Sequence, residues 1–345
     1  MRVGTDRGSR PDLPWRGEWT ILYDVIVSGG GPVGCAVARD LAGAGFKTLV
    51  LEEHPRIGEP VQCAGIVSRR TLELAGVSGR VVVQELRGMR VHSPLGTRLE
   101  LAGNRTYALV VDRAAFDLEV AGQAQRAGAE VRCGLRVGDA MVAADRVLIT
   151  AGRGDRVEEF SARLLVGADG QASTVAARFG LAGPVERVPM FAAEMALTRR
   201  PEPLMEVFLG RRVAPGWFCW LVPSGEGRVR VGTGAAGRAK GFSAMRPKAL
   251  FEAFRELHPD LLGRGRLIRS TGGLVPIGLS SRTCADRVML VGDAACQVKP
   301  VSGGGLYLGL KGARHCARVA AEALRANRLN EGFLARYQRD WTADI

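Results

Sequence analysis

Hydrophobic positions in residues 23–53 follow the pattern of a strand, a helix and a second strand. The runs Asp24–Ser28 and Lys47–Leu51 are short and mainly apolar, whereas residues 33–43 carry small side chains at helical spacing. A strand that is buried on both faces reads as a continuous apolar run, as it does in the middle of a parallel sheet. The segment therefore predicts a βαβ unit.

The next part of the chain predicts further strands and one amphipathic helix. Residues 81–111 alternate in strand fashion, with turns at SPLGT and AGN. The segment DRAAFDLEVAGQAQRAGAEVRCG predicts a helix that runs into a strand. The segment RVLITAGRGDRVEEFSARLLVGADG predicts a hairpin that leads into a buried strand.

Beyond residue 185 the pattern becomes β-rich and then returns to mixed α/β. We expect strands between about 185 and 275, with one helix near 244–257. Residues 286–295 predict a buried strand, after which a glycine loop opens a long helix at 303–325. This order predicts an α/β domain that is interrupted by β-rich inserts and closes late in the chain.

Both ends of the chain depart from this pattern. Residues 1–20 lack the apolar run of a signal peptide, and we expect a flexible extension there. The last residues predict a helix with one apolar face, formed by Phe333, Leu334, Tyr337, Trp341 and Ile345. Because the chain stops there without a cap, this uncovered face predicts that residues 331–345 are the start of a truncated helical segment.

Charge restricts the partners of the chain. The 345 residues carry a formal charge of +13, and only five of the 48 basic residues are lysines. The arginines form no basic run interleaved with aromatics, so nucleic acid is not an expected partner. Their scatter either reflects composition alone or provides a surface that attracts phosphates, anionic lipid or an acidic electron-donor protein. No run of 18 apolar residues exists, so we expect a cytoplasmic protein, with peripheral membrane contact as the alternative.

The seven cysteines form no Cys-x-x-Cys pair and are odd in number. This pattern argues against a disulfide framework and a zinc site, and it favours reduced thiols. Cys35 and Cys296 are expected in the core. Cys63, in EPVQCAGIVS, is different because it lies in a glycine-containing segment just after the second predicted strand.

The turn of the βαβ unit carries a nucleotide-binding fingerprint. Residues 29–34 read GGGPVG and fit Gly-x-Gly-x-x-Gly. Gly29 makes the turn, Gly31 lets the backbone approach a pyrophosphate, and Gly34 lets the helix pack on the strand. The helix N-terminus supplies amide donors for the phosphates. Glu52, at the end of the second strand, is placed to accept hydrogen bonds from ribose hydroxyls.

Two later buried strands also end in an aspartate. Asp169 and Gly170 end LLVGADG, and Asp293 ends VMLVGDAA ahead of the loop Gly303–Gly305, which comprises Gly303, Gly304 and Gly305. Together with the first fingerprint, these motifs resemble the FAD-containing hydroxylase and reductase superfamily. The resemblance implies that FAD is the cofactor and that Asp293 holds its ribityl chain. The chemistry is reasonable because a carboxylate accepts from hydroxyls and helix-terminal amides favour negative charge on the reduced ring.

The resemblance also bears on the arginine of VVDRAAFD and on the electron donor. Arg113 matches the usual arginine of the superfamily, which implies a contact with the cofactor; otherwise it is an exposed arginine at a helix start. Ala176 stands where the superfamily often has arginine, and no second Gly-x-Gly-x-x-Gly follows in a βαβ context. We therefore expect either transient binding of NAD(P)H or electrons from a protein such as reduced ferredoxin.

Two substrate-side segments look like those of the geranylgeranyl reductase family. The family carries a Pro-x-x-Cys-Gly segment, for which this chain has Pro60 to Cys63 with Ala64 in place of the glycine. It also carries Tyr-x-Trp-x-Phe-Pro, seven or eight residues, and then Gly-x-Gly. The matching residues here are Phe218, Trp220, Val222, Pro223, Gly232 and Gly234.

The resemblance implies reduction of C=C bonds in prenyl chains of a diphosphate, an isoprenoid lipid or a chlorophyll-type substrate. Phe218, Trp220, Pro223, Gly232 and Gly234 are then substrate-side residues. Cys63 is the candidate catalytic residue, as a proton donor or as a group that shapes the pocket. An unperturbed thiol has a pKa of about 8.5, so a concerted transfer in an aligned, dry pocket is the more reasonable form.

The fold class that follows is a Rossmann-like FAD-binding domain interrupted by an antiparallel β-rich substrate domain, with a helical C-terminus. The expected FAD-binding domain comprises residues 21–80, 111–184 and 271–330. The expected substrate domain comprises residues 81–110 and 185–270.

Three other functions fit parts of the sequence less well. A flavin monooxygenase would usually carry histidine after GDAA, where this chain has Cys296. A flavin halogenase shares the tryptophan pair Trp217 and Trp220, but it needs an early catalytic lysine, and no lysine lies between Lys47 and Lys240. A quinone-reducing electron-transfer flavoprotein would need an iron–sulfur cluster or partner, and no four-cysteine spacing exists.

Overall fold

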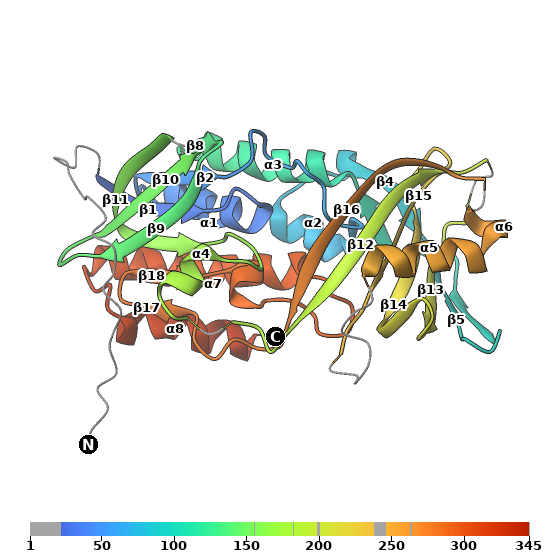
Figure 1. Ribbon diagram of the computed structural model, residues 1–345. Helices are drawn as coiled ribbons and strands as arrows, with labels where there is room; N and C mark the ends of the chain where they lie inside the picture. Colours follow the sequence, from blue (N-terminus) through green and yellow to red (C-terminus); the bar gives the residue numbers. More distant parts are fainter. Residues whose placement is uncertain are drawn as a thin grey trace, which may run out of the picture.

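The computed structural model describes residues 22–154, 156–181, 183–198, 201–237, 246–262 and 264–344. The N-terminal extension expected at residues 1–20 lies outside these residues, and so does Ile345. Figure 1 shows a mixed α/β sheet region at one end of the molecule and a long, largely antiparallel sheet at the other.

The first sheet has eight strands in the described part of the chain, and its core is parallel. Strands β17, β18, β11, β1, β2 and β8 follow one another in that order, and the β9–β10 hairpin extends from β11. β1 pairs in parallel with both β2 and β11. The strands are β1 (Leu22–Ser28), β2 (Thr48–Glu52), β8 (Glu130–Cys133), β9 (Arg136–Val142), β10 (Val147–Arg153), β11 (Arg156–Gly167), β17 (Cys284–Ala285) and β18 (Val288–Leu290).

Both faces of this parallel core are covered, which explains the continuous apolar runs of its strands. On one face, α1 (Pro32–Gly43), α3 (Arg113–Arg126) and α7 (Leu306–Arg325) pack over Val25 and Val27 of β1. On the other face, the β9–β10 hairpin and α4 (Thr174–Arg178) form a second apolar cluster with Ile26. The predicted βαβ unit is therefore confirmed.

The second sheet has seven strands in the described residues, in the order β16-β12-β15-β14-β13-β5-β6. All of its pairs are antiparallel except β5 with β13. Its strands are β5 (Gly88–His92), β6 (Arg98–Ala102), β12 (Glu186–Ala196), β13 (Met205–Gly210), β14 (Ala214–Pro223), β15 (Arg228–Gly234) and β16 (Arg266–Ile277). Helix α5 (Pro247–Leu257) and the short α6 (Pro259–Leu262) cover one face, where Phe251 and Phe254 pack into an apolar cluster. The opposite face of this sheet is the one that turns toward the loop of Cys63.

A small third sheet and a short helix connect the two larger sheets. It contains β3 (Ile66–Val67), β7 (Ala108–Val111) and β4 (Val82–Leu86), and α2 (Arg69–Ala75) follows β3. The expected substrate segment 81–110 is thus shared between this sheet, through β4 and β7, and the seven-stranded sheet, through β5 and β6. Short 3-10 turns at Gly79–Val81 and Gly292–Ala295 complete the connections.

Two predicted boundaries near the late glycine loop are wrong, and glycine geometry explains both. The strand expected at residues 286–295 spans only Val288–Leu290, because Gly292 has φ +67° and the chain turns there. The helix expected from residue 303 begins at Leu306, because Gly303 has φ +69°, which lies outside the helical region. The loop between them is therefore longer than the sequence pattern indicated.

The C-terminal helix α8 (Glu331–Ala343) covers its own apolar face. Leu334, Tyr337 and Trp341 are buried where α8 meets α7 and β17. The Tyr337 hydroxyl donates to the Leu290 carbonyl at 2.8 Å and accepts from Gln297 at 2.7 Å. The expectation that this face is uncovered is wrong for these three residues. Among the described helices, none combines the length and the apolar character needed to cross a membrane.

Candidate cofactor and substrate site

The glycine turn between β1 and α1 is closely packed at Gly29 and Gly34 and open at Gly31. A Cβ on Gly29 would lie 2.3 Å from the Ala168 carbonyl oxygen, and a Cβ on Gly34 would lie 2.2 Å from the Gly29 oxygen. A Cβ on Gly31 would meet no atom within 4 Å. Gly31 is the N-cap of α1, and it has no side-chain cap. The free helix terminus and the open side of Gly31 leave room for a pyrophosphate.

Glu52 lies beside this turn at the end of β2. Its carboxylate accepts hydrogen bonds from the Gly30 amide at 2.7 Å and the His54 amide at 2.9 Å. The side chain is nearly buried. These contacts fix the carboxylate next to the glycine turn, which is where the ribose prediction requires it.

Asp169 follows β11, and both of its carboxylate oxygens already accept hydrogen bonds from the protein. Its carboxylate accepts from the Ser173 hydroxyl at 2.6 Å and the Val175 amide at 3.1 Å, so it orders the first turn of α4. Desolvation raises the pKa of Asp169, although the hydrogen bonds from Ser173 and nearby amides oppose that shift. Gly170, at φ +76°, has open space on its Cβ side. The contribution of these two residues to cofactor binding stays a prediction.

Asp293 lies in the 3-10 turn Gly292–Ala295, and its carboxylate reaches Gly305 at the start of α7. Its side chain is exposed to solvent and makes no hydrogen bond to any other residue that the structure describes. A Cβ on Gly305 would lie 2.6 Å from Asp293 Oδ1, so glycine at 305 makes room for the carboxylate. Desolvation by the surrounding protein raises the pKa of Asp293, and Arg113 opposes this shift. A carboxylate that reaches the surface and has protein groups around it can accept hydrogen bonds from hydroxyls of a ligand.

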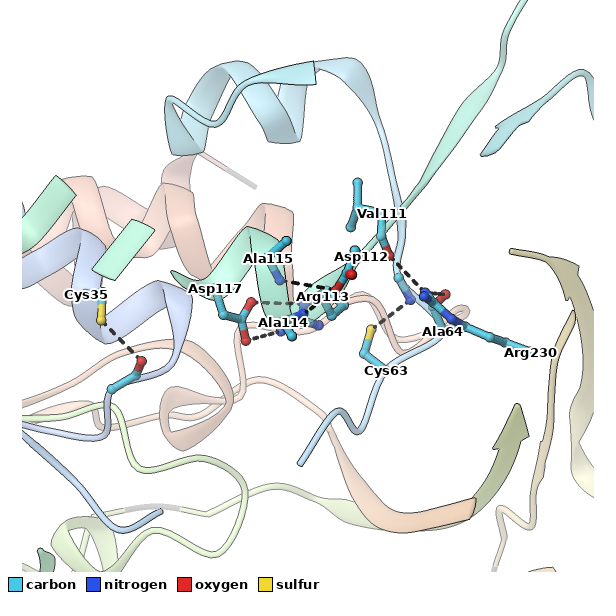
Figure 2. Close-up of polar contacts among 12 residues, drawn as sticks. Cys35, Cys63, Ala64, Val111, Asp112, Arg113, Ala114, Ala115, Asp117 and Arg230 are labelled. Carbon is cyan, nitrogen blue, oxygen red and sulfur yellow. Dashed lines mark hydrogen bonds and ion pairs between the residues drawn. The ribbon is translucent and has the colours of Figure 1, made fainter. Parts of the chain in front are cut away.

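Arg113 lies between Asp293 and the loop of Cys63. Asp112 caps α3 by accepting from the amides of the next turn. Arg113 then donates from Nε and Nη2 to the two oxygens of Asp117, both at 3.1 Å (Figure 2). Burial alone would lower the pKa of Arg113, but the Asp117 carboxylate and, after it, the Cys63 side chain raise it. A fixed positive charge therefore lies next to Cys63 and within electrostatic reach of Asp293.

Cys63 is an exposed thiol on the wall of a pocket. Its Sγ accepts from the Gly65 amide at 3.3 Å. The pocket lies between the Cys63 loop and the face of the seven-stranded sheet that α5 leaves open, and its wall includes Ala64, Ala192, Trp220, Arg230 and Thr271. By contrast, Cys35 and Cys296 are buried. The structure thus brings Cys63 together with Trp220 from the second predicted substrate motif.

The substrate motifs on β14 and β15 form one packed unit. Trp220 pairs with Gly232 across the two strands, and a Cβ on Gly232 would lie 2.2 Å from the Trp220 ring. A Cβ on Gly234 would lie 2.8 Å from Trp217. The indole N–H groups of Trp217 and Trp220 are buried without a partner among the described residues. Gly232 therefore makes room for the Trp220 ring on the pocket wall, and Gly234 makes room for Met190 and the Trp217 ring.

The remaining two motif residues support this unit. Phe218 is half-buried, and its ring stacks on Trp217 with centroids 5.2 Å apart. Pro223 is buried at the end of β14. Neither residue lines the pocket of Cys63, so their contact with substrate stays a prediction.

Comparison with known proteins identifies the family of the chain. A family model described as an FAD binding domain matches residues 22–343. The chain is 34% identical over 331 residues to digeranylgeranylglycerophospholipid reductase 2 of Methanothermobacter thermautotrophicus, covering 94% of this chain and 84% of the relative. It is 30% identical over 334 residues to digeranylgeranylglycerophospholipid reductase of Methanosarcina acetivorans, covering 93% and 80%. The chain belongs to the geranylgeranyl reductase family of FAD-dependent oxidoreductases.

Solved structures agree with this family. A geranylgeranyl bacteriochlorophyll reductase-like protein from Thermoplasma acidophilum matches with a TM-score of 0.85 and 27% identity, covering 94% of this chain and 84% of that one. A flavin-dependent brominase matches with a TM-score of 0.75 over 94% of this chain at only 17% identity, which shows a shared fold and no more. This geranylgeranyl reductase family member therefore has the expected fold class.

The residues of this family member fit FAD. Gly31 has open space on its Cβ side, the N-terminus of α7 at Gly305 has no side-chain cap, and the Asp293 carboxylate lies beside Gly305. Gly31 and Glu52 would hold the adenosine diphosphate half, and Asp293 would hold the ribityl chain. Gly303 and Gly304 lie in the same loop ahead of α7, and their part in binding stays a prediction.

The sequence patterns missed three charged residues at the pocket. They are Glu194 of β12, Arg230 of β15 and Arg269 of β16, and all three line it. In RVRVGTG, Arg228 and Arg230 alternate with valine, and the structure exposes Arg228 but buries Arg230. A buried charge at such a position needs a partner or a function.

The contact between Gly232 and Trp220 predicts an effect of substitution on activity. In Gly232→Ala the new methyl group overlaps the indole ring, so Trp220 must move away from its place on the wall. We expect an overpacking cost of about 1–3 kcal/mol in the free energy of unfolding. We also expect slower turnover at unchanged FAD content, measured by flavin absorbance and steady-state kinetics. Gly272→Ala in β16 is the matched control, because a Cβ there meets its nearest neighbour at an ordinary 3.4 Å. Equal behaviour of the two variants would contradict the assigned role of Gly232.

Proposed function

We propose that this chain is an FAD-dependent reductase that saturates C=C bonds in the geranylgeranyl chains of an isoprenoid glycerophospholipid. The printed names of its relatives support this substrate class, since two of them are digeranylgeranylglycerophospholipid reductases. Prenyl diphosphates and chlorophyll-type side chains are the alternatives. The observation that carries the proposal is the pocket between the Cys63 loop and the seven-stranded sheet, whose wall contains both Cys63 and Trp220.

The pocket wall suits a hydrocarbon chain. Ala192 and the Trp220 ring offer apolar surface, and Gly232 adds no side chain that would block it. Each methylene buried there contributes about 0.8 kcal/mol. A bound chain would also cover Cys63, which is otherwise exposed, and would remove water from around it.

Reduced FAD, when bound, supplies a hydride to one alkene carbon. The second alkene carbon needs a proton, and Cys63 is the proposed donor. Its S–H bond breaks, a C–H bond forms, and the electron pair remains on sulfur as a thiolate. The Gly65 amide and the Arg113 guanidinium lie beside that sulfur and favour the negative charge that develops there.

The electrons for the next turnover come from NAD(P)H or from reduced ferredoxin. The formal charge of +13 supports an acidic donor protein or peripheral contact with an anionic membrane. Both donors should be assayed with the same enzyme preparation.

Product mass tests the substrate assignment. The reduced enzyme is incubated without oxygen with digeranylgeranylglycerophospholipid, with geranylgeranyl diphosphate, and with geranylgeranylated chlorophyllide. We expect products heavier by two hydrogens per reduced bond, with the glycerophospholipid reduced fastest. Oxygenated products that form only after air is admitted would identify a monooxygenase and overturn the proposal.

A further inference from the structure

Arg230 connects the seven-stranded sheet to the loop that carries Cys63. It lies on β15 and is only 8% exposed. Its Nη1 donates to two backbone carbonyls, those of Ala64 and Val111, both at 2.9 Å (Figure 2). One guanidinium nitrogen therefore holds two segments that are far apart in the sequence.

These two carbonyls belong to the segments that present Cys63 and Arg113. Ala64 follows Cys63 directly, and Val111 lies two residues before Arg113. The Val111 amide also donates to the Gly65 carbonyl at 2.9 Å, which pairs the two segments. We call this group of contacts the Arg230 clamp; it comprises Arg230 and the backbone of residues 63–65 and 111–113.

Gly65 shows how closely the clamp is packed. It has φ +76°, and a Cβ there would lie 2.3 Å from Arg230 Nη1 and 2.7 Å from the Val111 oxygen. Only glycine combines this backbone conformation with such a close approach. The chain departs from the family pattern with Ala64 after the cysteine, and the required glycine lies one residue later.

The positive charge of Arg230 is balanced by Glu194 on the neighbouring strand β12. Its Nε lies 3.7 Å from Glu194, and the other Glu194 oxygen lies 2.7 Å from Nε of Arg269. Burial lowers the pKa of Arg230, and the Glu194 carboxylate opposes this effect. Cys63 also lies within electrostatic reach of Arg230. Glu194 thus stabilises the charged form of Arg230 in its buried position near Cys63.

We propose that Arg230 is a positioning residue that fixes Cys63 and Arg113 against the substrate wall of the seven-stranded sheet. In this role Arg230 acts through its hydrogen bonds to the Ala64 and Val111 carbonyls and not by contact with the reacting alkene or with FAD. The catalytic consequence rests on the proposed function, because it assumes that Cys63 serves prenyl reduction. The positioning itself rests only on the observed contacts.

The test compares Arg230→Met with Arg228→Met in the FAD-loaded protein. Arg228 is an exposed residue of the same strand, and its ion pair with Glu226 is long, at 4.0 Å. Arg230→Met should fold, because Glu194 keeps Arg269 as its partner. We expect the amides of Gly65 and Val111 to exchange hydrogen at least about tenfold faster in Arg230→Met than in Arg228→Met, since their segments lose a shared donor.

Steady-state kinetics distinguish an effect of Arg230 on the position of Cys63 from an effect on the stability of the protein. A misplacement on the order of 1 Å can cost about 100-fold in rate, so we expect kcat on the prenyl substrate to fall about 10- to 100-fold in Arg230→Met. We expect KM to change less than kcat, because the proposed role of Arg230 is to position the Cys63 loop rather than to bind the substrate. Arg230→Lys keeps the charge but lacks the planar guanidinium, and we expect exchange and kcat between those of wild type and Arg230→Met. The Lys variant also serves as the test if the Met variant fails to fold.

Two results would overturn the inference. One is amide exchange at Gly65 and Val111 that is the same in Arg230→Met, Arg230→Lys and Arg228→Met. The other is faster exchange with unchanged kcat, which would show that the clamp does not serve the chemistry. If the wild-type enzyme leaves prenyl chains unreduced, the proposed function fails, while the exchange rates still decide whether Arg230 positions the Cys63 loop.

Discussion

Replacing Cys63 by alanine should lower the rate of prenyl reduction by about 10²- to 10⁴-fold, the usual contribution of a positioned proton donor. Cys63 lies on the pocket wall, and its sulfur accepts from the Gly65 amide beside the Arg113 guanidinium. The substitution removes the proton donor and leaves the glycine turn and Asp293 untouched, so FAD content should not change. The measurement is the single-turnover rate of reduced enzyme with prenyl lipid, together with the flavin-to-protein ratio.

Cys133→Ser is the matched control for this experiment. Cys133 is the other exposed thiol among the described residues, at the end of β8, and its replacement should leave turnover unchanged. Cys63→Ser adds a second comparison, because a hydroxyl can still accept from Gly65 but is a much weaker acid than a thiol. Full turnover in Cys63→Ala at normal FAD content would refute a chemical role for this residue.

Replacing Asp293 by alanine should weaken FAD binding by about 10- to 100-fold. A hydrogen bond to a charged group contributes about 1.5–3 kcal/mol, and about 1.4 kcal/mol corresponds to a tenfold change in affinity. The carboxylate has no hydrogen-bond partner among the described residues, and the surrounding protein desolvates it. Its removal should therefore leave the thermal stability of the FAD-free protein unchanged or slightly raised.

Titration of FAD-free protein with FAD, followed by flavin fluorescence and by the melting temperature, separates these effects. The variant should show the smaller rise in melting temperature at a given FAD concentration, because stabilisation by a ligand depends on its concentration relative to Kd. Asp145→Ala is the control, since this carboxylate is exposed on the β9–β10 hairpin. Unchanged FAD affinity in Asp293→Ala would remove this residue from the cofactor site.

The sequence predicted well those elements that require particular residue types over a short stretch of the chain, such as the glycine turn and the buried strands. The turn needs glycine at Gly29 and Gly34, because at both positions a backbone atom lies within 2.3 Å of the place a Cβ would take, so its pattern is visible in a single sequence. The buried strands of the parallel core read as apolar runs for a similarly local reason. The strands expected between about 185 and 275, with one helix near 244–257, are confirmed by β12 to β16 and by α5.

Long-range contacts could not be read in the same way. The apolar face of α8 looks uncovered in the sequence because its partners, α7 and β17, meet it only in the folded chain. Arg230 gives a clearer case: it contacts carbonyls at positions 64 and 111 from a strand that begins at residue 228. No spacing rule connects these three segments. The sequence shows two arginines, Arg228 and Arg230, that alternate with valine, without an indication of which one is buried or of its partner.

The most direct test of the proposed activity is anaerobic single turnover of the reduced flavoprotein. Reduced enzyme is mixed with digeranylgeranylglycerophospholipid in the absence of oxygen. The absorbance of oxidised flavin is followed while the lipid mass is determined. We expect flavin reoxidation that depends on the lipid, with two hydrogens gained per flavin oxidised. Flavin that stays reduced until oxygen is admitted, with the lipid mass unchanged, would contradict it.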